Sequence, residues 1–393
     1  MPPQIILRKG RGQRQQTGHP WVYEGEIASV KGRPADGGIV DCVSWNGTFL
    51  GRGFYNSRSK IRLRILTRHP GDALDRGFLQ KRLAWALQRR ESLYPQATSL
   101  RLVHAEGDLL PGLTVDRYGD ALVMQCAALG MDQRQDEIAG MLQALTGIEH
   151  MYIRNDLSVR RNDGLPLECH FWGEAFPTSR QIEVGGLTFD VDLAEGHKTG
   201  FYLDQADNHL ALRQYVPSGG AVLDAFCYTG AFALQAAAAG AATVLGIDSS
   251  EAVLSMAQRH AERNGVSERC HFRAGNVFDQ LRHLAQGGEQ FDLVILDPPS
   301  FTRSRDAVAK ALSGYKEINL RALKLLRPGG ILITFTCSYY VDRLHFEAML
   351  QQAAGDARCQ LMVRQRFGQA AHHPEVISIP ETGYLKGLAV EVW

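Results

Sequence analysis

The feature that most constrains the fold is a regular alternation of apolar strands and helices from about residue 186 onward. The apolar segments are GAVLDAFCY, ATVLGIDSS, CHFRAGN, FDLVILDPP and GGILITFTC, and helical stretches separate them. Strands that are joined by helices form a parallel sheet with both faces covered. Ligands of such sheets bind at the carboxyl ends of the strands, so we expect the functional residues there.

The chain has 393 residues, a length that predicts two or three domains rather than one. We predict a β-rich domain at 1–72, a small central α+β domain at 73–185 and a Rossmann-like α/β domain at 186–393. In the central domain, DRGFLQKRLAWALQRRESLY predicts a helix with a basic outer face, and a second helix is expected around 132–146. The expected strands there are RLVHAEG, ALVMQCAAL and HMYIRN.

The composition is typical of a soluble globular protein, with 45% hydrophobic and 22% charged residues. No stretch approaches the roughly 18 consecutive apolar residues of a membrane span. The N-terminal segment MPPQIILRKGRGQRQQ lacks the apolar core of a signal peptide, so we expect a cytoplasmic protein. The seven cysteines are scattered without a CxxC pair, which predicts neither a disulfide framework nor a metal site.

Charge is distributed unevenly along the chain. Residues 1–70 contain twelve Lys and Arg against four acids, a net charge of +8, which leaves −7 for the remainder. The segment KIRLRIL alternates basic with apolar residues, so Arg62 and Arg64 are expected on one strand face and Leu63 on the other. This asymmetry favours a polyanion such as RNA as the partner, and a merely solvated basic face is the alternative.

The turn after the first apolar strand predicts the cofactor. DAFCYTG (224–230) contains a single glycine instead of GxGxxG, which disfavours the pyrophosphate of a nicotinamide cofactor. An acid at the strand end and a glycine at the helix start favour S-adenosylmethionine, with Asp224 near its ammonium group. Asp248, at the end of the second strand, is expected to accept both ribose hydroxyls. Asn276 is placed to contact the adenine, and a simple turn asparagine is an equally good interpretation.

The fourth strand ends in DPPSF (297–301). Two prolines directly after a buried strand make a rigid loop, because they remove N–H donors and restrict φ. Such a loop, with Phe301, is typical of class I methyltransferases that act on planar nitrogenous rings, where it holds a flipped base opposite the methyl group. A purely structural turn is the alternative.

Cys337 follows the fifth strand and is the candidate nucleophile. Carbon-5 of cytosine takes a methyl group only after a thiolate has added to carbon-6, and a cysteine that faces the DPP loop would supply it. A free cysteine on a buried strand is most often there for packing, and this is our interpretation of Cys227, which lies in the cofactor turn.

These motifs together resemble a known family. GHKTGFYLDQ (196–205), DAFCYTGAF (224–232), LDPPSF (296–301), GYKEIN (314–319), FTCS (335–338) and YLKG (384–387) occur in the order found in the bacterial 23S rRNA (cytosine-C5)-methyltransferases of the RlmI type. That family combines an N-terminal PUA domain, a central α+β domain and a Rossmann-like methyltransferase domain. The resemblance covers the whole chain and is strongest over 196–338.

The resemblance implies a role for individual residues. Cys337 is the implied nucleophile, and Asp297 lies beside the target base. The implied cofactor-binding residues are Lys198, Thr199, Tyr202, Asp204, Gln205, Asp224, Phe226, Tyr228, Gly230, Asp248, Ser249, Asn276, Val277 and Asp297. The implied substrate-binding residues are Pro298, Pro299, Phe301, Arg62 and Arg64.

The chain departs from the family pattern in two places. Ala206 stands where an arginine is expected, and Ser300 replaces a lysine that is common after DPP. The chain also lacks the PC pair of RNA C5-methyltransferases that use two cysteines. The resemblance predicts 23S rRNA as the partner. The sequence leaves the target nucleotide and the oligomeric state open, with a homodimer among the options.

Two other functions fit the same motifs. DPP-F loops also serve methylation of exocyclic amines or guanine nitrogens, which needs no cysteine. A non-catalytic rRNA-binding assembly factor with a degenerate methyltransferase fold is the second alternative, and the intact DPP loop, Asp248 and Cys337 disfavour it.

Overall fold

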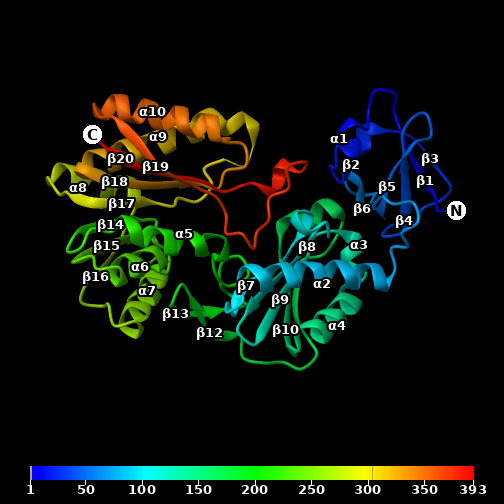
Figure 1. Ribbon diagram of the computed structural model, residues 1–393, viewed down its shortest axis with the longest axis horizontal. Helices are drawn as coiled ribbons and strands as arrows, with labels where there is room; N and C mark the ends of the chain where they lie inside the picture. The colour runs from blue at the N-terminus through cyan, green and yellow to red at the C-terminus, as the bar shows by residue number, and fades with distance from the viewer. Residues whose placement is uncertain (1, 303) are drawn as a thin grey trace. The chain divides into compact units, whose positions relative to one another are not determined.

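The computed structural model describes residues 2–302 and 304–393. The chain forms two compact units (Figure 1), each built from several segments. The first comprises Met1–Ile182, Val191–Leu203 and Ala371–Gly383, and the second comprises Glu183–Asp190, Asp204–Ala370 and Tyr384–Trp393. The first unit thus contains most residues of the first two predicted domains, and the boundaries at 72 and 185 remain a prediction. No helix among the described residues is long and apolar enough to cross a membrane.

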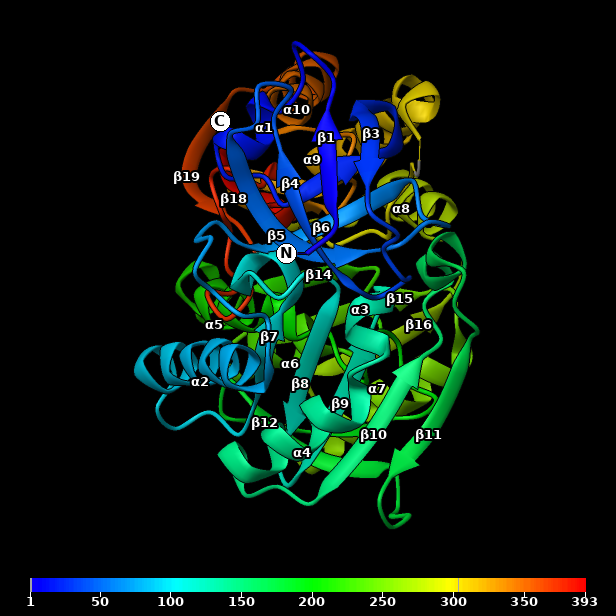
Figure 2. The same ribbon diagram turned by 90° about the vertical axis from the view of Figure 1, so that its right-hand side faces the viewer.

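The N-terminal part of the first unit is a six-stranded sheet (Figure 2) with the strand order β2-β6-β5-β4-β1-β3. Its strands are β1 (Gln4–Leu7), β2 (Trp21–Tyr23), β3 (Ile27–Lys31), β4 (Ile39–Val43), β5 (Phe49–Tyr55) and β6 (Ile61–Thr67), with the short helix α1 (Gln13–Gln16) after β1. The alternation predicted for β6 is present. Leu63 and Ile65 are buried in the core of this sheet, whereas Arg62 and Arg64 are partly exposed.

A five-stranded sheet, ordered β11-β10-β9-β8-β7, forms the centre of the first unit. Its strands are β7 (Ser99–His104), β8 (Leu113–Tyr118), β9 (Ala121–Cys126), β10 (His150–Asn155) and β11 (Glu168–Trp172). The helices are α2 (Arg76–Leu93), α3 (Leu129–Asp132) and α4 (Gln135–Thr146), so both predicted helices are present. Asp75 is the N-cap residue of α2, and its side chain accepts a hydrogen bond from the Phe78 N–H. We did not expect β8 and β11.

The second unit contains a seven-stranded sheet with the order β16-β15-β14-β17-β18-β20-β19. Its strands are β14 (Ala221–Ala225), β15 (Thr243–Asp248), β16 (Cys270–Ala274), β17 (Phe291–Leu296), β18 (Leu326–Thr336), β19 (Leu361–Phe367) and β20 (Lys386–Val392). The first five in that order pair in parallel, as the strand–helix alternation predicts. β20 and β19 extend the sheet with antiparallel pairing, which we did not predict. A separate two-stranded sheet, β12 (Ser179–Val184) and β13 (Leu187–Asp192), precedes it.

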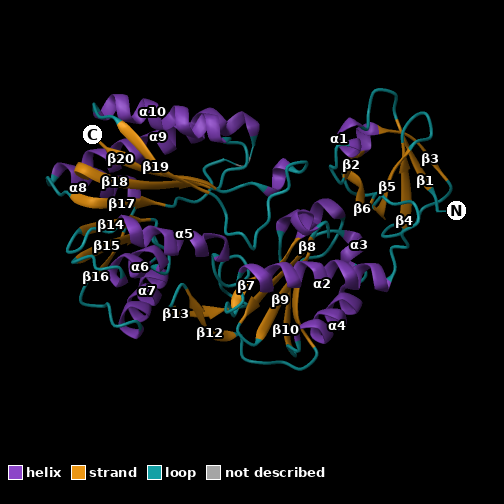
Figure 3. Cartoon of the chain, viewed as in Figure 1, coloured by secondary structure: helices purple, strands orange, loops and turns teal. Residues whose placement is uncertain are grey.

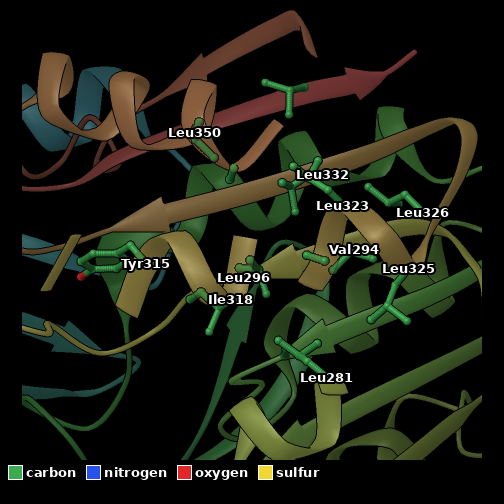
Figure 4. Close-up of a cluster of buried hydrophobic side chains, with 14 of the residues drawn as sticks. Leu281, Val294, Leu296, Tyr315, Ile318, Leu323, Leu325, Leu326, Leu332 and Leu350 are labelled. Atoms are coloured by element: carbon green, nitrogen blue, oxygen red, sulfur yellow. The ribbon is translucent and has the colours of Figure 1, made fainter. Parts of the chain in front are cut away.

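Helices cover both faces of the seven-stranded sheet (Figure 3). The helices are α5 (Ala206–Ala211), α6 (Ala231–Ala238), α7 (Glu251–Arg263), α8 (Val277–Gln286), α9 (Val308–Leu325) and α10 (Arg343–Ala357). The buried core between the sheet and the layer of α8, α9 and α10 (Figure 4) includes Leu281, Leu296 and Ile318. Because this core is closely packed and includes residues of β17 and β18, the loops after these strands start from a rigid base.

Candidate functional site

Four candidate side chains lie at the carboxyl ends of adjacent parallel strands of the second unit. Asp224 precedes the last residue of β14, Asp248 ends β15, Asp297 follows β17 and Cys337 follows β18. The pairs Ala225 with Ile247, Ala225 with Leu296, and Leu296 with Thr334 set the register of these strands. The four side chains therefore gather at one edge of the sheet, where ligands of parallel sheets bind.

The cofactor turn after β14 has an unusual backbone. Phe226 and Tyr228 have φ angles of 70° and 49°, in the left-handed region that residues with a Cβ rarely adopt. Gly230 has a φ of 85°, so a residue with a Cβ would be strained there, and its Cβ would also lie 2.9 Å from Leu234 Cδ1. Such strained turns persist where the surrounding structure holds them, and they are frequent at ligand sites.

Asp248 is the residue that holds this turn from β15. Its Oδ2 accepts a hydrogen bond from the Tyr228 N–H at 3.1 Å, and its Oδ1 accepts one from the Ser250 N–H at 3.1 Å. A carboxylate has about four acceptor positions, so two remain for ribose hydroxyls. Asp248 is half-buried and the adjacent Ser249 is exposed, so both can reach a ligand at this edge.

Asp224 is fully buried at the centre of the edge. Its Oδ2 accepts a hydrogen bond from the Ala233 N–H at 2.9 Å, whereas its Oδ1 has no partner among the described residues. Burial raises the pKa of this carboxyl to about 8, and the negative charges of Asp297 and Asp248 contribute to the increase. An unpaired buried oxygen beside two further carboxylates favours a bound cation, and S-adenosylmethionine carries two positive groups.

The predicted adenine contact lies at the start of α8. Asn276 is the N-cap residue of this helix, and its Oδ1 accepts a hydrogen bond from the Phe278 N–H at 2.9 Å. The interpretation as a structural asparagine therefore has direct support, and the exposed amide NH₂ remains available to a ligand. Val277 is buried in the core of the second unit, so its side chain packs there.

The DPP loop and the loop of Cys337 are joined by hydrogen bonds. Ser300 Oγ lies 2.9 Å from Ser338 Oγ, and the Tyr315 hydroxyl lies 2.8 Å from the same Ser338 oxygen. Phe301 stacks on the ring of Tyr315 with centroids 4.4 Å apart. Tyr315 and Ser338 are fully buried, so the contact between these two residues is shielded from water, whereas Ser300 is exposed. The half-buried Cys337 is therefore held beside a loop whose Pro299 is exposed and whose Pro298 is buried.

Three residues of this arrangement were not singled out from the sequence. They are Ser338, Tyr315 and Lys386. The ammonium group of the buried Lys386 donates to the Ser338 carbonyl at 3.0 Å. Tyr315 lies in the motif GYKEIN and Lys386 in the motif YLKG. The sequence showed both motifs, but it did not show that these two side chains contact Ser338. Ser300, noted only as a departure from the family pattern, is the residue that joins the DPP loop to this contact.

Cys227 has the environment of a packing residue. Its side chain is buried, and burial together with the charges of Asp224 and Asp248 raises the pKa of its thiol well above the ordinary value. A thiol of this kind is a poor nucleophile, because the thiolate is the reactive form. The interpretation of Cys227 as packing agrees with this environment.

The predicted residues of 196–205 are divided between the two units. In the first unit, Thr199 donates from its hydroxyl to Asp116 Oδ2 at 2.6 Å, and the Lys198 ammonium lies 4.4 Å from the centre of the Tyr202 ring. In the second unit, Asp204 and Gln205 are buried. The Tyr384 hydroxyl, from the YLKG motif, donates to Asp204 Oδ2 at 2.8 Å.

The predicted RNA-contacting arginines of β6 form ion pairs within the first unit. Arg62 pairs with Glu24, and Arg64 pairs with Asp163 at 3.2 Å. Their side chains are 19% and 12% exposed, so each presents only part of its surface to a ligand. The sequence did not reveal that Arg64 joins the N-terminal sheet to the central part of the unit. A role of both residues in RNA binding remains a prediction.

Comparison with known proteins identifies both parts of the chain. A PUA-like domain model matches residues 5–68, and a methyltransferase domain model matches residues 217–372. The chain is 39% identical to ribosomal RNA large subunit methyltransferase I of Shewanella amazonensis, with 99% of both chains covered. It is 37% identical to the protein of the same name from Escherichia coli O9:H4, with 100% of both chains covered.

Solved structures share the fold over almost the whole chain. A structure described as a methyltransferase in complex with SAH has a TM-score of 0.85, with 21% identity and 99% of each chain covered. A structure described as a SAM-dependent methyltransferase from Streptococcus mutans has a TM-score of 0.84 at 20% identity, again with 99% of each chain covered. At this level of identity the likeness shows the fold.

Proposed function

The chain belongs to the ribosomal RNA large subunit methyltransferase I family, and we propose that it methylates carbon-5 of a cytosine in 23S rRNA through a covalent adduct with Cys337. The membership confirms the family expected from the sequence motifs. The enzyme is an S-adenosylmethionine-dependent methyltransferase with an N-terminal PUA-like domain. The position on the base, the nucleophile and the 23S target are the proposed part.

The observation that carries the proposal is the attachment of the Cys337 loop to the DPP loop. β17 and β18 are parallel neighbours, and Ser300, Ser338 and Tyr315 connect the loops at their carboxyl ends. A base held against Pro299 and Phe301 would therefore lie beside the Cys337 thiol. Carbon-5 of cytosine needs such a thiol, whereas an amine target does not.

The residues of this edge fit the cofactor. Asp248 would hold the ribose, Asp224 would lie near the ammonium group, and Gly230 allows close approach to the backbone at the start of α6. S-adenosylmethionine, when bound, supplies an electrophilic methyl group. Tyr228, Phe226, Ser249 and Asn276 would complete the site around the adenosine, and Asp297 would lie between cofactor and base.

The proposed reaction begins when the Cys337 thiolate bonds to carbon-6 of the cytosine. The electron pair of the carbon-5–carbon-6 double bond then forms the new bond from carbon-5 to the methyl group, and the bond from sulfur to methyl breaks. The carbon-5 proton leaves to a base, the double bond forms again and the bond to Cys337 Sγ breaks. The thiolate is thereby regenerated.

The experiment uses Cys337→Ala with Cys227→Ala as the matched control. We expect Cys337→Ala to abolish methyl transfer to unmodified rRNA and to leave affinity for cofactor and RNA nearly unchanged, because only the reacting group is lost. Mass spectrometry of the nucleosides should show 5-methylcytosine with the wild type and Cys227→Ala. RNA that contains 5-fluorocytosine should trap both as covalent complexes, since fluorine does not leave as a proton does. Normal turnover by Cys337→Ala would overturn the proposal in favour of amine methylation.

A further inference from the structure

Helix α2 of the central domain presents an aromatic and basic stripe on its outer face. Phe78, Arg82, Trp85 and Arg89 follow one another at a spacing of three or four residues, so their side chains share one side of the helix. The neighbouring side, with Leu79, Leu83 and Ala86, is buried in the core of the first unit, and Phe78 packs partly against this core. Figure 1 shows α2 on the outside of the five-stranded sheet.

Trp85 is one of several large apolar side chains that are exposed, and it stands out because it lies among basic residues of a surface helix. Its relative exposure is 65%, whereas the outer face of a surface helix normally carries polar and charged residues. The indole adds little to the stability of the folded chain at this exposure, because little of its apolar area is removed from water. Most of the indole is therefore accessible to a ligand.

The guanidinium of Arg82 lies beside the indole. The guanidinium carbon lies 5.5 Å from the centre of the Trp85 ring and 5.2 Å from the centre of the Phe78 ring. A further contact, from Arg82 Nη2 to the Leu66 carbonyl at 3.4 Å, anchors the guanidinium to β6. Trp85 is thus flanked by a cation and remains accessible, which is the arrangement of a stacking platform for nucleic-acid bases.

The charge around Trp85 is positive. Lys81 and Arg89 lie one helical turn before and after it, and both are exposed. Within residues 2–302 and 304–393, neither of them forms an ion pair with an acidic side chain, and Glu91 is the single acid of the helix. Two accessible cations on either side of an exposed indole match the phosphates that flank a base in a nucleic-acid strand.

We propose that this face of α2, formed by Lys81, Arg82, Trp85 and Arg89, binds an unpaired segment of the RNA substrate, with one base stacked on Trp85. The proposal rests on the proposed function in that RNA is the substrate, and it adds a second contact region outside the PUA-like domain and the DPP loop. An unpaired segment fits better than a duplex, because bases inside an A-form helix are stacked on one another and have no free face.

The test measures binding of the full-length protein to a fluorescent single-stranded RNA of mixed sequence, about 20 nucleotides long, and to the same RNA paired with its complement. Trp85→Ala should weaken binding to the single strand roughly 5- to 100-fold, because one base–aromatic stack is lost. Duplex affinity should change less than twofold, and Trp85→Phe should restore most of the loss. The control is Trp393→Ala, which removes an indole of similar exposure, 68%, and should leave both affinities unchanged.

Salt dependence separates stacking from charge. Trp85→Ala should keep the wild-type slope of affinity against salt, whereas Lys81→Gln with Arg89→Gln should reduce it by about 0.7 for each cation that contacts a single strand. Unchanged single-strand affinity of Trp85→Ala, or equal losses for single strand and duplex, would overturn the proposal and indicate a protein partner or no partner for this face. Because these measurements do not involve methyl transfer, an error in the proposed chemistry would not affect their outcome.

Discussion

A single substitution at Asp248 would change its contacts to the turn together with the ribose contact that we propose. Its carboxylate supports the strained turn through the Tyr228 and Ser250 N–H groups, and we expect it to bind the ribose as well. Asp248→Ala should weaken S-adenosylmethionine binding by about 1.5–3 kcal/mol, the range for a lost hydrogen bond to a charged group. Asp248→Asn keeps one acceptor oxygen for the turn and should lose less. Calorimetry would measure the affinity of both variants for the cofactor. An unchanged affinity in Asp248→Ala would show that Asp248 does not contact the cofactor.

We expect Asp224 to make cofactor binding dependent on pH. Its pKa of about 8 means that the carboxyl is mostly protonated at pH 7 before the ligand binds. A cation nearby favours the carboxylate and lowers the pKa, so binding at pH 7 should release a proton, and affinity should rise with pH up to about 8. Calorimetry in buffers with different ionisation enthalpies measures the released proton. Asp224→Asn should abolish the release, and a wild type that releases none would contradict this role.

At the level of secondary-structure elements, α9 connects the DPP loop to the loop of Cys337 through Tyr315. The hydroxyl accepts from the Phe301 N–H at 3.4 Å and contacts Ser338, so it connects the ends of β17 and β18. Tyr315→Phe should remove the hydrogen bonds of the buried hydroxyl to the Phe301 N–H and to Ser338, and lower the free energy of unfolding by about 1–2 kcal/mol. Because the loops lose alignment, kcat should fall about 10- to 100-fold with little change in cofactor affinity.

The control for α9 is Tyr215→Phe. That hydroxyl donates to Gln365 of the edge strand β19 at 2.8 Å, so its removal also costs a hydrogen bond within the second unit. Thermal unfolding and single-turnover methyl transfer should be measured for both variants. Equal kcat for Tyr315→Phe and Tyr215→Phe would show that Tyr315 only stabilises the fold.

At the scale of the whole molecule, the charge of the chain is concentrated in its N-terminal sheet. The total is +1, yet residues 1–70 carry +8, and Arg8, Lys9 and Arg11 among them are exposed. Replacement of these three by Gln should reduce the slope of RNA affinity against salt by about 2, since each contact to a single strand contributes about 0.7. The same change at the exposed Lys324, Arg343 and Arg358 should leave the slope unaltered. Equal slopes for both triple variants would mean that the basic charge is only a solvated face.

The sequence by itself determined the features that depend on local pattern. Five parallel strands, the turn with a single glycine, the prolines after β17 and the cysteine after β18 all follow from neighbouring residues. Burial selects apolar residues with the period of the element, so a window of some ten residues is enough to predict the element and its end. The order of the motifs then identified the family.

Only the tertiary structure decided which distant residues meet. Ser300 and Ser338 lie 38 positions apart and Arg64 and Asp163 lie 99 apart, yet each pair is in contact. The antiparallel β20, the exposure of Trp85 and the raised pKa of Asp224 depend in the same way on remote neighbours. A hydrogen bond or a charge interaction acts across a few ångströms of space regardless of separation along the chain, so its partners are known only once the strands and helices have packed.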